Sequence, residues 1–240
     1  MSKRIKHYRT INVSPQKIAS EQLSLTMETP NEVVIKVPQY AGDESLPVVR
    51  VGDMVRRGQL IAKGENSMPS YASVSGIVTE VTIEDNSIAV TIESDGKDRN
   101  ADTITKPVCD SRQSFLEQVR RSSVMNNYAP LYQLLDRADL KGLYITGTQL
   151  EPMLTSAHRT VVEDMDDMLL GLEVMSKYPG LRLIVVCLED VDRSIAEEMM
   201  AKADDYNLRG KLKIRLIAGR YVQRDKDIFT LEMTGRRPEE

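Results

Sequence analysis

The spacing of hydrophobic residues in this 240-residue chain changes near residue 110, and this change constrains the fold more than any other feature. Residues 30 to 93 are rich in Val, Ile, Gly, Ser and Thr and are interrupted by turn residues, which is typical of short β-strands. Beyond residue 110, stretches with helical spacing alternate with short apolar runs. The sequence therefore predicts a two-domain α+β protein, with an all-β domain followed by an α/β domain.

The first region predicts four strands, at residues 33–37, 60–62, 77–83 and 88–92. Strict alternation in the third strand predicts that one face carries Ile77, Thr79, Val81 and Ile83. Residues 94–107 are polar and lack a period, which indicates a linker or a long surface loop. We place the domain boundary at the end of this segment, which gives domains of residues 1–107 and 108–240.

The second region alternates strands and helices. Strands are predicted at residues 143–146, 181–187 and 212–217. Helices are predicted to begin at Ser114, at Leu131, after Pro152 and at Asp192 or Ser194. The third is expected to be one long helix with a stripe of methionine and leucine on its buried face. Short connections between such elements favour right-handed crossovers and a short parallel sheet, as in a Rossmann-like domain.

The most specific stretch runs from Leu46 to Val81 and contains two predicted glycine turns and a glycine that begins a strand. Its pattern, V-G-D-x-V-x-x-G-Q followed by A-S-V-S-G-x-V, resembles the barrel-sandwich hybrid of lipoyl and biotinyl domains. We expect positive φ angles at Gly52, Gly58 and Gly76. A carrier domain would need a lysine at a hairpin tip, but the expected tip at residues 65–69 has none, and Lys63 precedes it.

A wider resemblance covers most of residues 35 to 238. Its motifs are Pro38–Gly42, the Gly147, Glu151 and Pro152 positions, Tyr221–Lys226 and Thr234–Pro238. They resemble the C subunit of the Rnf complex, an ion-translocating ferredoxin:NAD oxidoreductase related to the NADH- and flavin-binding subunit of respiratory complex I. The resemblance implies a barrel-sandwich hybrid followed by an α/β domain like the complex I flavoprotein core.

This sequence departs from the family where the family's cofactors bind. The family's loop G-L-G-G-A-G-F-P-T-x-x-K falls at residues 123–134, where only Pro130 matches. Residues 126–128 put side chains where glycines let a backbone approach a phosphate or a flavin ring. The family's lysine falls on Leu134. We therefore expect the family's flavin loop to be lost.

A second departure concerns sulfur chemistry. Gln149 and Leu150 replace Glu and Cys in the family motif N-G-A-E-C-E-P. The family continues into two four-cysteine motifs, whereas this sequence ends at Glu240 and has two cysteines, Cys109 and Cys187. Four thiolates hold a [4Fe–4S] cluster, so we expect no iron–sulfur cluster. Cys187 is expected to be a small core residue.

Two functions of different classes follow. The first is a degenerate accessory or assembly protein of an electron-transfer system, which docks on protein partners and is not an enzyme on its own. The second is a flavin- or NADH-binding electron-transfer subunit that uses another loop, as an oxidoreductase subunit. Gly147 and Glu151 would then bind FMN or NADH, because Gly147 follows a strand and precedes a helix. If the first function is right, we expect no cofactor. For both functions, we expect neither a catalytic residue nor a metal site.

Two other groups could carry chemistry. An acidic cluster could bind a metal only if its oxygens converged on one point. We instead expect a solvated helix face, near an end of the helix where the dipole favours negative charge. It comprises Glu163, Asp164, Asp166 and Asp167. His158 follows the Gly147 turn, and a general base is conceivable there. We expect a surface histidine, because no Ser, Cys or Asp partner motif accompanies it.

Charge and hydropathy restrict the partners. A net charge of −4 and a pI near 5.5 argue against nucleic acid as a partner. The first residues show no secretory signal. No run approaches the ~18 to 20 apolar residues of a membrane helix. We therefore expect a cytoplasmic protein without direct membrane insertion, held through a partner at the inner face of the membrane.

Overall fold

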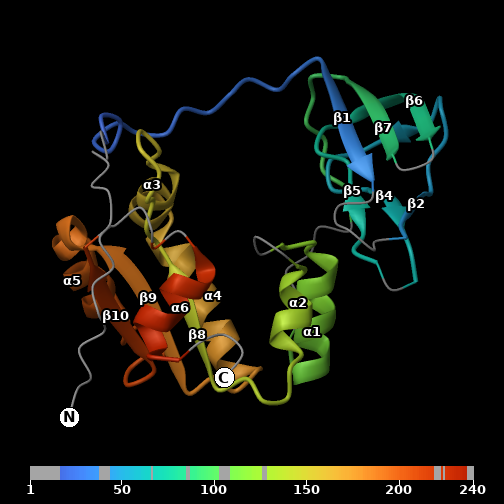
Figure 1. Cartoon of the computed structure of the whole chain (residues 1–240). Helices are drawn as coiled ribbons and strands as arrows, with labels where there is room; N and C mark the ends of the chain where they lie inside the picture. The colour runs from blue at the N-terminus through green and yellow to red at the C-terminus, as the bar shows by residue number, and fades with distance from the viewer. Residues whose placement is uncertain are drawn as a thin grey trace, which may run out of the picture. The chain divides into compact units, whose positions relative to one another are not determined.

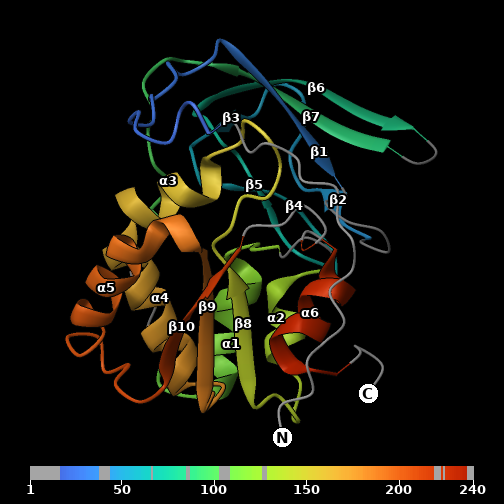
Figure 2. The ribbon, with the colours of Figure 1, turned by 60° about the vertical axis from the view of Figure 1, so that its left-hand side comes forward.

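The computed structural model describes residues 17–37, 44–65, 67–84, 87–102, 109–125, 129–218, 223 and 225–236 (Figures 1 and 2). Contacts within the chain form two compact units. One is Thr26–Asp139, and the other combines Met1–Leu25 with Leu140–Glu240. This division differs from the predicted boundary after residue 107, because the helices before Leu140 group with the β-strands and residues 17–25 group with the α/β region.

The unit Thr26–Asp139 contains the predicted barrel-sandwich hybrid. Its strands are β1 (Glu32–Val37), β2 (Leu46–Pro47), β3 (Met54–Val55), β4 (Leu60–Lys63), β5 (Ser70–Tyr71), β6 (Gly76–Glu84) and β7 (Ser87–Ser94). They form two antiparallel sheets, in the orders β1-β7-β6-β3 and β2-β4-β5 (Figure 1). Branched side chains fill the space between them, among them Val55, Ile61, Val78, Val90 and Ile92. The sequence missed the two-residue strands, which are too short to show a period.

The predicted alternation along β6 is wrong. The register of β6 against β7 shifts between Val78 and Glu80, so one extra residue bulges out. Val78 is 1% exposed and Val81 packs against the same core, whereas Ile77 is 38% exposed. The bulge changes the face on which later side chains lie, and alternation alone cannot reveal it.

The three glycines have two different roles. Gly52 and Gly58 have φ angles of 94° and 81°, as predicted for tight turns. The prediction is wrong for Gly76, which is a strand residue without a positive φ. A Cβ on Gly76 would lie 1.9 Å from the carbonyl oxygen of Glu93 on β7. This position requires glycine because two backbones approach closely.

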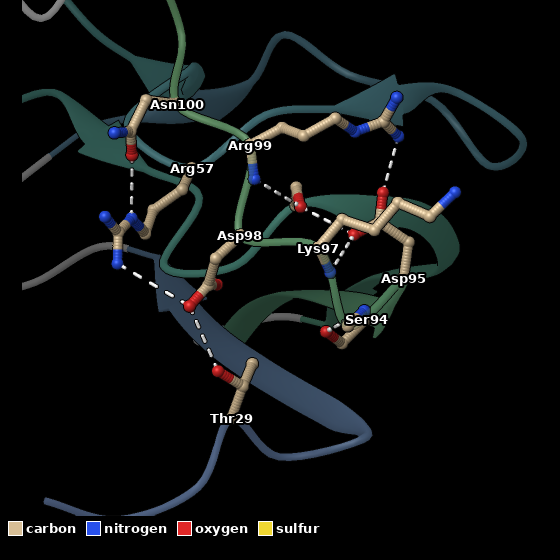
Figure 3. A network of polar contacts seen from close by, with 10 residues as sticks. Thr29, Arg57, Ser94, Asp95, Lys97, Asp98, Arg99 and Asn100 are labelled. Carbon is tan, nitrogen blue, oxygen red and sulfur yellow. Dashed lines mark hydrogen bonds and ion pairs between the residues drawn. The ribbon is translucent and has the colours of Figure 1, made fainter.

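Residues 94–102, the described part of the predicted linker, close the barrel as a surface loop. Asp95 accepts hydrogen bonds from the Ser75 hydroxyl at 2.6 Å and from the Lys97 amide at 2.9 Å, and it pairs with Arg99. Nearby, the Thr29 hydroxyl donates to Asp98 at 3.1 Å (Figure 3). These bonds tie the loop to the barrel. Residues 103–107 of the predicted linker lie outside the described residues.

This loop makes a testable prediction about pH. The hydrogen bonds from Ser75 and Lys97, together with Arg99, lower the pKa of Asp95 to about 2. A lowered pKa stabilises the fold above the unfolded-state pKa, and the stabilisation is lost as pH falls from about 4 to about 2. We expect Asp95→Asn to lower the melting temperature by several degrees at neutral pH and to have almost no effect near pH 2.

Thermal unfolding followed by circular dichroism checks this expectation. The matched control is Glu93→Gln, which removes an exposed carboxylate of β7 that has no hydrogen bond or ion pair to the described residues. Equal melting temperatures for Asp95→Asn and wild type at neutral pH would contradict the prediction.

Two helices follow the barrel, α1 (Arg112–Arg121) and α2 (Leu131–Leu135). Ser114 does not begin α1 as predicted. Ser111 is the N-cap, and Ser114 is the N3 residue whose hydroxyl reaches back to the Ser111 amide, at 3.0 Å. This reciprocal capping box satisfies two amides of the first turn and sets the start of the helix.

The α/β unit contains the predicted parallel sheet. Strands β8 (Gly142–Thr146), β9 (Leu183–Glu189) and β10 (Leu212–Ile217) lie in the order β10-β9-β8 (Figure 2). Its helices are α3 (Ser156–Glu163), α4 (Met165–Lys177), α5 (Arg193–Lys202) and α6 (Lys226–Thr234). The central strand β9 is buried on both faces, with Val186 against α4 and α5 and Cys187 against α6. Cys187 is therefore the core residue that the sequence predicted.

The helix predicted after Pro152 is two helices. Asp164 has φ −118° and ψ 30°, which ends α3 and begins α4. Asp166 and Asp167 then lie in the first turn of α4, where the helix dipole favours negative charge. The start of α4 thus accounts for two members of the acidic cluster. The predicted apolar stripe packs on the core as expected, with Met168 and Met175 partly buried and the other members buried, namely Met165, Leu169 and Leu172.

Candidate functional site

The predicted ligand position is the loop that joins the carboxyl end of β8 to α3. Gly147 is buried at the start of this loop, and its amide donates to the Cys187 carbonyl at 2.8 Å. A Cβ on Gly147 would lie 2.7 Å from Leu188 Cδ2 and 3.5 Å from Val161 Cγ2. The absence of a side chain at Gly147 therefore lets the strand end and α3 pack together, and its amide is engaged within the sheet.

Gln149 occupies the amino-terminal end of α3. Its Oε1 accepts hydrogen bonds from the Ser156 hydroxyl at 2.7 Å and from the Ala157 amide at 3.0 Å. Its own amide donates to Glu189 at 3.2 Å, at the end of β9. Free amides at a helix start are the usual donors to a phosphate. Here one of those donors, and the neighbouring hydroxyl, are already bonded to a side chain of the same loop.

Lys17 binds the other side of the loop from far away in the sequence. Its ammonium group donates to the carbonyl oxygens of Gln149, Glu151 and Leu154, the latter two at 3.2 and 2.6 Å. A lysine ammonium has three donor hydrogens, so all three can be used here. Of the two predicted cofactor-binding residues, Gly147 is thus engaged through its amide and Glu151 through its carbonyl.

Residues 17–25 form a strap that continues from Lys17 along α3. The Ser20 carbonyl accepts a hydrogen bond from Arg159 at 3.1 Å, and the Ser24 amide donates to Glu163 at 2.9 Å. Glu163 also accepts from Arg159 Nε at 2.9 Å. Hydrogen bonds from Ser24 and Arg159 lower the pKa of Glu163 to about 2, so this carboxylate is charged at neutral pH.

Lys17 is expected to hold this strap in place. Replacing it by methionine leaves three carbonyls without their charged donor, and hydrogen bonds to charged groups stabilise by about 1.5 kcal/mol or more. We expect Lys17→Met to speed chymotrypsin cleavage within residues 23–27 about tenfold, because local opening precedes cleavage. Leu23, Leu25 and Met27 are highly exposed cleavage positions there.

Peptide mapping by mass spectrometry identifies the cleavage sites. The control is Lys213→Met, since Lys213 is an exposed residue of β10 whose side chain has no hydrogen bond or ion pair to the described residues. Equal cleavage rates in Lys17→Met and Lys213→Met would show that Lys17 does not hold the strap.

His158 has an acidic partner that the sequence analysis missed. Its Nδ1 lies 2.9 Å from Oδ1 of Asp192, which is 6% exposed at the start of α5. Asp192 follows β9 as His158 follows β8, and parallel strands bring such segments to the same sheet edge. The predicted order of strands places both residues near one sheet edge, but only the structure shows that they meet. The pair links α3 to the start of α5, and no serine or cysteine nucleophile is bonded to it among the described residues.

The acidic cluster does not converge on one point. Asp166 accepts hydrogen bonds from Lys202 at 3.1 Å and from Tyr206 at 3.0 Å, whereas Glu163 binds the strap. In the described part of the chain, no group of three or more His, Cys, Asp or Glu side chains is arranged to hold a metal. The cluster is divided between two helices, with Glu163 paired with Arg159 and Asp166 paired with Lys202.

The segment aligned with the family's glycine loop belongs to the other compact unit. Met125 and Pro130 form an isolated β-bridge, and Ser123, with a φ of 53°, donates its hydroxyl hydrogen bond to the Pro69 carbonyl. Residues 126–128, which carry the predicted loss of glycine, lie outside the described residues. Leu134 lies within α2.

This combination defines a class, a barrel-sandwich hybrid joined to a complex I flavoprotein-like α/β region. Residues 8–97 match the family model described as the RnfC barrel sandwich hybrid domain. Residues 131–240 match the model described as the Nuo51 FMN-binding domain. The chain accordingly resembles the C subunit of Rnf complexes over most of its length.

Curated relatives agree with these matches. One is the C subunit of the proton-translocating ferredoxin:NAD(+) oxidoreductase complex of Clostridium ljungdahlii, which is 28% identical over 223 residues, covering 86% of this chain and 48% of the relative. Another is the C subunit of the Na(+)-translocating complex of Acetobacterium woodii, which is 26% identical over 228 residues, covering 86% and 50%. The chain thus spans about half the length of these relatives.

At the β8–α3 loop, donors that a flavin phosphate could use are already bonded within the chain. An amide and a hydroxyl at the start of α3 are bonded to Gln149, and the Gly147 amide is bonded to β9. The loop carbonyls hold Lys17. Separately, none of the helices in the described parts of the chain combines the length and the apolar character that a membrane span needs.

Proposed function

We propose that this chain is an Rnf C subunit-like component of an electron-transfer system that acts by docking to protein partners. In this proposal it is a degenerate accessory or assembly protein without its own flavin or iron–sulfur cluster. The redox centres then belong to partners, and the chain does not catalyse electron transfer on its own. It works in the cytoplasm, held by a partner at the inner face of the membrane.

One observation carries this proposal. At the start of α3, the Ser156 hydroxyl and the Ala157 amide are bonded to the side chain of Gln149. Lys17 is bonded to three carbonyls of the β8–α3 loop. A phosphate bound at the start of α3 would have to displace the Gln149 side chain, which would lose its hydrogen bonds to Ser156 and Ala157. The two cysteines, of which Cys187 is buried, are too few for a four-thiolate cluster.

The alternative is a flavin- or NADH-binding electron-transfer subunit. The match of residues 131–240 to a domain described as FMN-binding favours it. In that case Gly147 and Glu151 would contact the cofactor, and the strap would have to move away from the loop. The alternative therefore predicts that cofactor binding and strap docking compete.

Titration of flavin mononucleotide with the full chain distinguishes these functions. We expect no saturable quenching of flavin fluorescence at high protein concentration, because the Ser156 hydroxyl and the Ala157 amide are bonded to Gln149. The same titration with Lys17→Met, and with Gln149→Ala, asks whether either residue blocks the loop. Saturable quenching by the wild-type chain, weakened by Glu151→Ala, would establish the alternative.

The carrier interpretation of the barrel has its own test. Lys63 is the last residue of β4, just before the turn that joins β4 to β5, and is the lysine that a cofactor could modify there. Intact mass spectrometry of the protein purified from its native source is expected to give the unmodified mass. A mass increase located on Lys63 would make the barrel a carrier domain.

A further inference from the structure

A cavity of about 1100 Å³ lies within the unit Thr26–Asp139, between the barrel and α1. The β4–β5 hairpin, the turn at Gly58 and the last turns of α1 supply most of its walls. The carbonyls of Ser67 and Pro69 accept hydrogen bonds from Arg120, at 3.4 Å, and from Ser123. The helix is thereby fixed to the hairpin, so the cavity is held open by the fold of one unit.

The charge of the lining is unbalanced. Four cationic side chains face two carboxylates, and the cations are Arg56, Lys63, Arg120 and Arg121. Glu117 pairs with Arg120 at 3.1 Å and with Arg121 at 3.3 Å, and Asp102 pairs with Arg56 at 3.1 Å. Two carboxylates thus serve three arginines. The side chain of Lys63 has no hydrogen bond or ion pair with any described residue.

The remaining walls are apolar or neutral. Leu60, Ala101 and Tyr71 also line the cavity, and we call these three residues its floor. Burial raises the pKa of Tyr71 even though Arg121 and Arg120 oppose the shift, so its hydroxyl is neutral at physiological pH. An apolar and aromatic floor surrounded by arginines is the composition of protein–protein interfaces.

We propose that this cavity binds an acidic segment of a protein partner, with carboxylates at the cations and an apolar side chain on the floor. Small-ligand sites usually have volumes of about 300 to 1,000 Å³ and enclose their ligand. Here the volume is larger, and the side chains of Arg56 and Arg121 are 51% and 64% exposed. Exposed cations select and orient an acidic protein surface. This inference rests on the proposed docking function, and it specifies that the protein partner presents an acidic segment.

The probe is a short fluorescein-labelled peptide in which glutamate alternates with leucine, titrated with the full chain and followed by fluorescence anisotropy. We expect saturable binding that weakens as salt is raised, because screening acts on exposed charges. The matched peptide with lysine in place of glutamate should not bind. Lys63→Glu should weaken binding about tenfold, since it reverses a charge at the cavity.

Lys97→Glu is the matched control, because Lys97 is an exposed residue of the same unit outside the lining and undergoes the same charge change. Melting temperatures establish that both variants fold. Absence of binding by the glutamate peptide, or equal weakening by Lys63→Glu and Lys97→Glu, would overturn the inference. Displacement of the peptide by micromolar pyrophosphate would overturn it too, in favour of a small-anion site. Flavin binding tests the docking function separately, so the two failures are distinguishable.

Discussion

Replacing Gly76 by alanine is expected to destabilise the barrel by about 3 kcal/mol or more, because overpacking against fixed backbone cannot be relieved by a rotamer change. The added Cβ would lie 1.9 Å from the Glu93 carbonyl oxygen and 3.0 Å from the Ser94 Cα. Relief would require β6 and β7 to separate, although these two strands form the longest ladder in the barrel. Urea unfolding of the full chain, followed by circular dichroism, measures the change.

Gly171→Ala is the matched control for this prediction. Gly171 lies in α4, and a Cβ there would meet no atom within 4 Å. Alanine is favoured over glycine in a helix by about 1 kcal/mol, so this variant should be more stable than wild type. If Gly76→Ala unfolded at the same urea concentration as wild type, this result would contradict the close approach of the β6 and β7 backbones.

Gly147→Ala is expected to destabilise the α/β unit by roughly 2 kcal/mol through overpacking, since its Cβ would lie 2.7 Å from Leu188 Cδ2 in a closed core. Leu188→Val removes that atom and by itself should cost about 1 kcal/mol. The two changes should compensate, with a favourable coupling of about 1 kcal/mol in the double variant. Urea unfolding of the four proteins gives the coupling.

This double-variant cycle separates packing from ligand binding at the same residue. If Gly147 served ligand binding alone, Gly147→Ala would leave the free energy of unfolding unchanged and would lower flavin affinity. Additive effects of Gly147→Ala and Leu188→Val would also contradict the packing role. The flavin titration of the same proteins supplies the second readout.

Local sequence patterns predicted the barrel and the parallel sheet because both depend on signals from neighbouring residues. The turns at Gly52 and Gly58 require positive φ, and only glycine adopts it readily. The apolar run of β9 predicted a strand with Cys187 in the core, and the structure confirms both. Where local signals failed, at the β6 bulge and at the break at Asp164, pairing and packing with other elements decided the geometry.

The sequence by itself thus determined the two fold types, the buried position of Cys187 and the loop in which Gly147 lies. Only the tertiary structure decided what that loop does. Lys17 is 132 residues away from Gln149, and no periodicity or motif connects them. Asp192 meets His158 because parallel strands end at a common edge. Hydrogen-bond partners so distant along the chain are chosen by the packing of whole elements, which a local pattern does not contain.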